Sequence, residues 1–147
     1  MASDFELSLF EQELIEVRAL PESSRWTLER DEAVPLGLIA QMYSVKDPEA
    51  LYLARIRWVS YLKPPSLKFL NRQTRADNDP TAWPQCRGFR PSSLDACVSW
   101  TAEGHGLHPE WANSTRAAYS EPEAPMQFAL LTLQHELDTT YTGRGKP

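Results

Sequence analysis

The residue of this chain best suited to nucleophilic chemistry is Cys97. It lies in residues 88–100 (GFRPSSLDACVSW), which show neither a helical nor a strand period. Long irregular segments are uncommon in small domains and are usually functional or disordered, and the aromatic and cysteine content here argues against disorder. A thiol can hold an acyl group as a thioester, which divides one difficult acyl transfer into two easier steps. The alternative interpretation is that Cys97 is a small buried apolar residue, a common role for cysteine.

A second thiol, Cys86, competes with Cys97 as a nucleophile. It is followed directly by Arg87, whose positive charge favours an ionised thiol. Two cysteines in a chain without a secretory signal fit a reducing compartment. We therefore expect free thiols, no Cys86–Cys97 disulfide and a cytoplasmic protein.

The histidines suggest two further kinds of site. A histidine beside Cys97 would favour a cysteine hydrolase, although a His-Pro pair before a tryptophan also fits a loop that packs on the body of the protein. Cys86, Cys97, His105 and His108 supply the four ligands that a structural zinc site needs, but their spacing differs from the usual zinc motifs. We expect no metal, and a zinc-binding domain is a minor alternative.

Length and charge restrict the class of protein. The chain has 147 residues, enough for one domain with its own core, which we place at residues 1–147. A formal net charge of −5 and the lack of basic runs argue against nucleic acid or an anionic membrane surface as a partner. No apolar stretch approaches the roughly 20 residues that span a bilayer. The sequence has no glycine-rich phosphate loop, so we expect no cofactor.

The first predicted element is a helix that begins after Ser3. Ser3 and Glu6 form a capping-box pattern, and Pro21 ends the helix. One face of this helix is apolar at helical spacing, with Leu7, Phe10, Leu14 and Val17. The other face is acidic and is predicted to be solvated, with Glu6, Glu11, Glu13 and Glu16.

Four strands and a second long helix are predicted to follow. The strands are expected at residues 26–30, 36–43, 51–59 and 66–70, joined by short turn-rich connections that favour an antiparallel meander. A polar loop then carries the isolated aromatic residues Trp83 and Phe89, and the last helix is entered through Pro125. The predicted fold class is α+β, with an N-terminal helix, a four-stranded antiparallel meander, a long active-site loop and a C-terminal helix.

The order of these pieces resembles the ubiquitin-conjugating (E2) family. A Lys63-Pro64-Pro65 corner precedes the fourth strand, Gly88-Phe89-Arg90 leads to Cys97, and His108-Pro109 and Trp111 follow it. The chain looks most like the atypical branch whose members are often tail-anchored, and like compact bacterial E2-like proteins. The resemblance is strongest over residues 50–114 and implies a UBC-like fold.

The resemblance also implies a reaction. Cys97 would accept the C-terminal carbonyl of a ubiquitin-like modifier from an E1-like activating enzyme and pass it to an amine of a protein substrate, with or without a ligase. Cys86 lies upstream of the position where the family places its nucleophile, so it is interpreted as structural. Most members carry a His-Pro-Asn run whose asparagine supports the oxyanion, and this chain lacks that run. The candidates to replace it are backbone amides, Ser92, Ser93 and Asn113.

The family places two docking loops beside the active site. By resemblance, the partner-binding residues here are Leu62 with Lys63 and Pro64 at the start of the proline corner, and Trp111, Ala112 and Asn113 after the cysteine. Leu62 on a proline-stiffened corner would lose little entropy on binding, and its alternative is ordinary core packing. The alternative to a conjugating enzyme is a catalytically inactive E2 variant that keeps the shape and serves as an interaction module.

Overall fold

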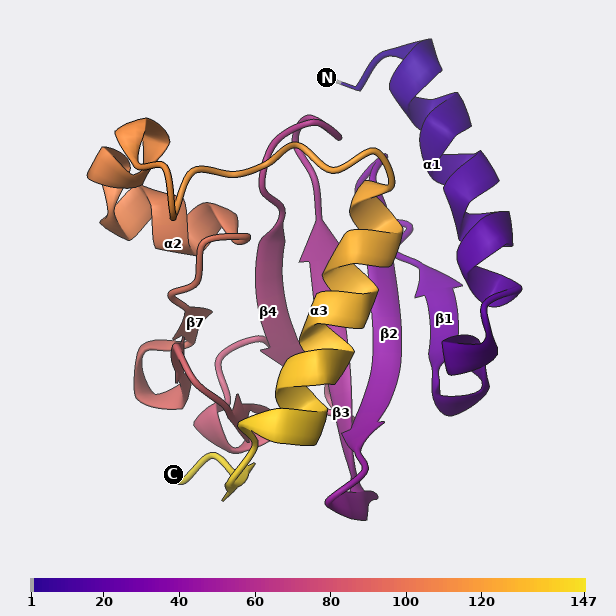
Figure 1. Ribbon diagram of the computed structural model, residues 1–147. Helices are drawn as coiled ribbons and strands as arrows, with labels where there is room; N and C mark the ends of the chain where they lie inside the picture. The colour runs from indigo at the N-terminus through magenta and orange to yellow at the C-terminus, as the bar shows by residue number, and fades with distance from the viewer. Residues whose placement is uncertain (1) are drawn as a thin grey trace.

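The computed structural model describes residues 2–147 and shows two long helices on one side of an antiparallel sheet (Figure 1). The sheet has the strand order β1-β2-β3-β4. Its strands are β1 (Thr27–Arg30), β2 (Gly37–Ser44), β3 (Asp47–Arg57) and β4 (Ser66–Leu70). The long helices are α1 (Asp4–Arg18) and α3 (Pro125–Thr139). The predicted α+β class, with an N-terminal helix, a four-stranded meander and a C-terminal helix, is confirmed.

The N-terminus of α1 is fixed by the predicted capping box. The Ser3 hydroxyl accepts the backbone N–H of Glu6, and the Glu6 carboxylate accepts the backbone N–H of Ser3. These two bonds satisfy N–H groups that the first helical turn leaves free. The apolar stripe points inward, and Phe10, Leu14 and Val17 are buried.

The prediction of a solvated acidic face on α1 is wrong for Glu13. Its side chain is buried, with 5% of the residue exposed. The reason lies in its partners, because the carboxylate accepts the Tyr61 hydroxyl and the backbone N–H groups of Met126 and Gln127. A buried carboxylate is stable only with such donors.

The inner and outer faces of the sheet differ in how they are covered. On β3, Tyr52, Ala54 and Ile56 enter the main core, as their alternation predicts. The outer face is not exposed to solvent along its whole length, because Ile39, Leu53 and Leu70 form a small buried cluster there. Residues 71–79 contribute two ion pairs to this side of the sheet, Arg75–Glu29 and Arg55–Asp77.

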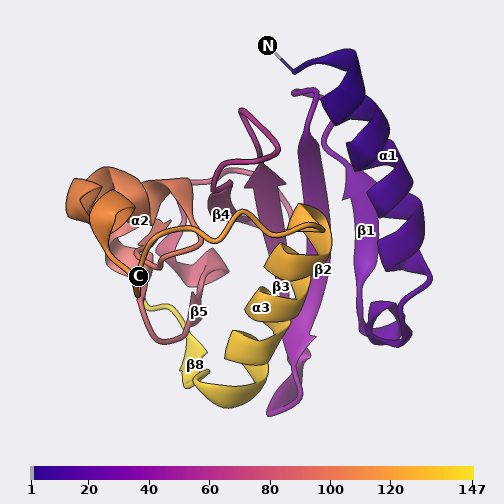
Figure 2. The same cartoon turned by 45° about the horizontal axis from the view of Figure 1, so that its top comes forward.

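The irregular segment after β4 contains a series of short elements. They are η2 (Pro80–Ala82), β5 (Pro84–Gln85), β6 (Phe89–Arg90), η3 (Pro91–Ser93), β7 (Asp95–Ala96), α2 (Ala102–Leu107) and η4 (Pro109–Asn113). Trp83 and Phe89 are buried against Phe69, so the predicted pinning of this segment by its aromatic residues is confirmed. Figure 2 shows α2 beside the β4 edge of the sheet.

The C-terminal residues of the chain pack back against this irregular segment. Beyond α3, the Tyr141 hydroxyl bonds that of Tyr52 at 2.6 Å, and β8 (Gly143–Arg144) pairs with β5. The N–H of Gly145 donates to the Trp83 carbonyl at 2.7 Å. Among residues 2–147, no helix has the length and apolar character to cross a bilayer.

Candidate active site

Cys97 follows a two-stranded hairpin formed by β6 and β7. Phe89 pairs with Ala96, Arg90 pairs with Asp95, and the Cys97 N–H donates to the Gly88 carbonyl at 2.8 Å, which extends the ladder by one pair. Phe89 and Ala96 are buried, so Arg90, Asp95 and Cys97 face outward by strand alternation. The thiol of Cys97 is accordingly half-buried rather than part of the core.

Gly88 is required opposite Cys97 for two reasons. Its φ of +80° lies in the left-handed region that residues with a side chain rarely adopt. A Cβ atom at this position would also come within 2.6 Å of Val98 Cγ1. The Val98 side chain fills the space that a Gly88 side chain would need, so only glycine fits at this position.

An ion pair occupies the same outward face of the hairpin. Arg90 donates from Nε and Nη2 to the two carboxylate oxygens of Asp95, at 2.8 and 2.7 Å. Hydrogen bonds to Asp95 raise the pKa of Arg90. The negative charge of Asp95 is thus balanced by Arg90.

The helix α2 is attached directly to the cysteine segment. The Thr101 hydroxyl caps the helix by accepting the Gly104 N–H at 3.1 Å, and it donates to the Ala96 carbonyl at 2.6 Å. A Cβ atom at Gly104 would lie 2.2 Å from the Val98 carbonyl oxygen, so only glycine permits this close packing. The helix therefore fixes the backbone on both sides of Cys97.

The same helix ties the cysteine segment to the proline corner and β4. The N–H of Ala102 donates to the Pro65 carbonyl at 2.8 Å. Glu103 accepts the Ser66 hydroxyl and, at 3.1 Å, the Leu67 N–H. Two of the sequence features on which the resemblance rests, the proline corner and the cysteine segment, are thus connected through α2.

The structure places the three predicted oxyanion candidates in two different elements. Ser92 and Ser93 are exposed in η3, at the turn of the hairpin and beyond the Arg90–Asp95 pair. Asn113 is exposed at the end of η4. The feature of the site that our sequence interpretation missed is the Arg90–Asp95 pair, because strands of two residues carry no period from which the hairpin could be predicted.

Four of the predicted docking residues line two separate cavities of the surface. Lys63, Pro64 and Ala112 line one cavity of about 280 Å³ together with His105 and Tyr119. Leu62 lines a separate groove of about 290 Å³. With 55% of the residue exposed, Leu62 is not a core residue.

Trp111 is half-buried and packs against two histidines. It stacks on the His108 ring with centroids 4.4 Å apart and meets His105 edge-on. His105 Nε2 lies 2.7 Å from the Ser99 carbonyl oxygen. These contacts give the two histidines a packing role at the end of α2.

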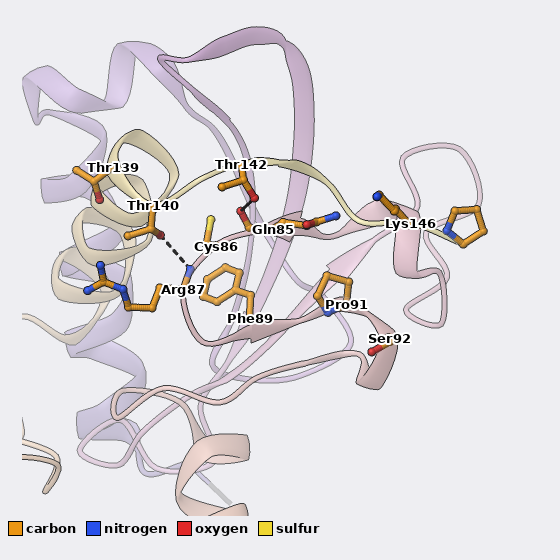
Figure 3. A pocket seen from close by; sticks show the side chains of 11 residues that line it. Gln85, Cys86, Arg87, Phe89, Pro91, Ser92, Thr139, Thr140, Thr142 and Lys146 are labelled. Atoms are coloured by element: carbon orange, nitrogen blue, oxygen red, sulfur yellow. Dashed lines mark hydrogen bonds between the residues drawn. The ribbon is translucent and has the colours of Figure 1, made fainter.

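Cys86 lines a groove of about 750 Å³ between the hairpin, the end of α3 and the C-terminal residues (Figure 3). Burial of the thiol, followed by the charge of Glu136, raises its pKa to about 12. The expectation that the charge of Arg87 favours an ionised Cys86 thiol is therefore wrong. The Arg87 side chain is exposed, and its backbone N–H donates to Thr140 Oγ1 at 3.0 Å.

Both cysteines are free. Within residues 2–147, no three His, Cys, Asp or Glu side chains come together in a group that could hold a metal ion. Cys86, Cys97, His105 and His108 therefore do not form the zinc site considered as an alternative. No protein-family model, curated protein or solved structure matches the chain.

Proposed function

We propose that this protein is an E2-like conjugating enzyme. In this proposal Cys97 accepts a ubiquitin-like modifier from an E1-like activating enzyme as a thioester and transfers it to an amine of a protein substrate. The observation that carries it is the half-buried Cys97 thiol on the outward face of a hairpin, in a backbone fixed by α2. A carrier thiol must be reachable by two large partners in turn, and a fixed backbone keeps the reacting carbonyl in one place.

The arrangement of the elements supports a UBC-like fold as part of the same proposal. A helix precedes a four-stranded meander, the cysteine segment lies beside β4, and a helix follows it. The Pro65 corner and the cysteine segment are joined through α2. Cys86 is the weaker candidate, because its raised pKa leaves little thiolate at neutral pH.

A charging assay tests the proposal. The protein is incubated with its activating enzyme, the modifier and ATP, and we expect an adduct that a reducing agent removes. Cys97→Ser should give a stable ester or no adduct, and Cys86→Ala is the matched control that should still be charged. An unchanged thioester on Cys97→Ala, with loss on Cys86→Ala, would transfer the assignment to Cys86.

A second candidate function, a non-enzymatic interaction module, is favoured by the groove beside α1. Leu9 and Leu62 give this groove an apolar lining, and Glu16, Glu121 and Glu123 make its rim acidic. Such a surface suits a partner with apolar and basic side chains. A protein that binds its partner equally well as wild type and as Cys97→Ala, and that is never charged, would be such a module.

A further inference from the structure

The Arg90 side chain has donors that its ion pair does not use. Asp95 takes the Nε–H group and one hydrogen of Nη2. A guanidinium also carries two N–H groups on Nη1 and a second one on Nη2. Among residues 2–147, no other acceptor for Arg90 is found, and its side chain is 45% exposed. Asp95 thus holds the guanidinium in one orientation and leaves three donors open to a ligand.

These donors lie on the same side of the hairpin as the thiol. Phe89 and Ala96 point into the core, so by strand alternation Arg90, Asp95 and Cys97 point outward. Diagonal neighbours in a ladder are about 7–8 Å apart at the backbone, which a long side chain can span. The Cys97 charge also contributes to the raised pKa of Arg90, after the contributions of Asp95.

We propose that Arg90, oriented by Asp95, donates hydrogen bonds to the oxyanion that forms at the carbonyl carbon bound to Cys97. Arg90 thereby fills the role for which the sequence offers no His-Pro-Asn asparagine, and the inference rests on the proposed function. Ser92 and Ser93 lie beyond the ion pair, and Ser92 lines the Cys86 groove instead. A guanidinium is the stronger donor, because its hydrogen bonds to an anion are charge-assisted.

The oxyanion arises twice in the reaction. In charging, the Cys97 thiolate attacks the thioester carbonyl of the activating enzyme, the carbonyl π electrons move to oxygen, and collapse expels the other thiolate, which takes up a proton. In transfer, the substrate amine attacks the Cys97 thioester, the oxyanion forms again, and the C–S bond breaks. The amine proton then passes to the released Cys97 thiolate. Arg90 stabilises the same oxygen in both steps.

The test uses a small acyl donor, so that it does not depend on an activating enzyme. Wild type and variants are acylated on Cys97 with a glycylglycine benzyl thioester, and the acyl group is then transferred to hydroxylamine as the amine acceptor. Intact mass spectrometry follows the rate of acylation and the rate of transfer. Arg90→Gln should slow both steps by about tenfold to a hundredfold. Arg90→Lys should restore part of the loss. Arg87→Gln, which removes the same charge at the entrance of the hairpin, should stay within about twofold of wild type.

Two further measurements separate this role from a structural one. Asp95→Asn keeps the guanidinium and should lose less activity than Arg90→Gln, whereas a purely structural ion pair would make the two variants equal. The ratio of Cys97 alkylation by iodoacetate to that by iodoacetamide reports the local charge, and it should fall several-fold in Arg90→Gln. Arg90→Gln behaving like Arg87→Gln, or a wild-type Cys97 that the thioester never acylates, overturns the inference. Failure of charging by an activating enzyme, with these results intact, overturns only the proposed function.

Discussion

The carboxylate of Glu13 accepts the backbone N–H of Met126 at 3.1 Å, and so joins the first helix of the chain to the start of the last one. The N-cap residue of α3, Ala124, offers no side-chain acceptor of its own. The second oxygen of Glu13 accepts the Gln127 N–H at 2.8 Å. A negative charge at this position also interacts favourably with the N-terminal end of the helix dipole. Glu13 therefore caps α3 from a helix more than a hundred residues away in sequence.

The first prediction concerns this cap. Glu13→Ala leaves two helix N–H groups and the Tyr61 hydroxyl without an acceptor inside the protein, and should lower the free energy of unfolding by about 2–4 kcal/mol. Urea unfolding followed by circular dichroism measures the change. Glu16→Ala, one turn further along and exposed, is the control and should change stability by less than about 0.5 kcal/mol. Equal effects of the two variants would contradict the capping role.

The second prediction concerns acid stability through Asp138. Burial by itself raises the pKa of this carboxyl, but hydrogen bonds from Arg25 and the Val45 N–H outweigh it, so the pKa lies below its ordinary value. A depressed folded-state pKa gives stability that is present above the unfolded pKa of about 3.9 and is lost as the pH falls through the folded pKa. Unfolding free energy should therefore decrease below about pH 4.

Asp138→Asn checks this assignment. It should cost about 1–3 kcal/mol at neutral pH and flatten the decrease of stability below about pH 4. Glu49→Gln, which removes a carboxylate from an exposed position, should leave the acid profile as in wild type. The outcome that would refute the prediction is an Asp138→Asn profile parallel to that of wild type down to about pH 2.

The sequence was sufficient to predict the elements whose pattern is local. Helix α1 follows from its capping box and apolar stripe, and the four strands follow from alternation and turn residues. The burial of Glu13 was not predicted, although this residue lies three positions after Phe10 and four before Val17 and so belongs to the apolar stripe. Its donors come from a segment whose position depends on the whole fold. A local pattern cannot identify such partners.

The site was predictable only in part, for the same reason. Cys97 and the docking residues were selected from their order in the chain, whereas the Arg90–Asp95 pair depends on the register of a hairpin with strands of two residues. Strands this short carry no period that could be read. The raised pKa of Cys86 likewise depends on its burial beside the end of α3, which the neighbouring Arg87 gave no reason to expect.

The third prediction concerns the relative reactivity of the two thiols. Alkylation with iodoacetamide near neutral pH should modify Cys97 first, because a pKa of about 12 leaves Cys86 about a thousandfold less thiolate than an ordinary thiol near pKa 9. Peptide mapping by mass spectrometry measures both rates in one sample. In urea-unfolded protein the two rates should become similar. Faster modification of Cys86 in the folded protein would show that its surroundings differ from those described.

The fourth prediction concerns Leu62 as a docking residue. Leu62 is exposed and lines the groove beside α1, so its truncation removes apolar contact area from a partner rather than from the core. Leu62→Ala should therefore slow charging or transfer while changing the free energy of unfolding by less than about 0.5 kcal/mol. Thermal unfolding and a single-turnover charging assay measure the two effects.

Two variants in the same part of the chain calibrate this result. Val59→Ala truncates a residue that is 90% exposed and outside the groove, and should alter neither stability nor charging. Leu67→Ala truncates a fully buried leucine of β4 and should cost about 2–5 kcal/mol. A Leu62→Ala variant that loses stability as Leu67→Ala does would identify Leu62 as a packing residue. Full charging activity at normal stability would remove this groove from the docking surface, because its most accessible apolar side chain would then contribute nothing to partner binding.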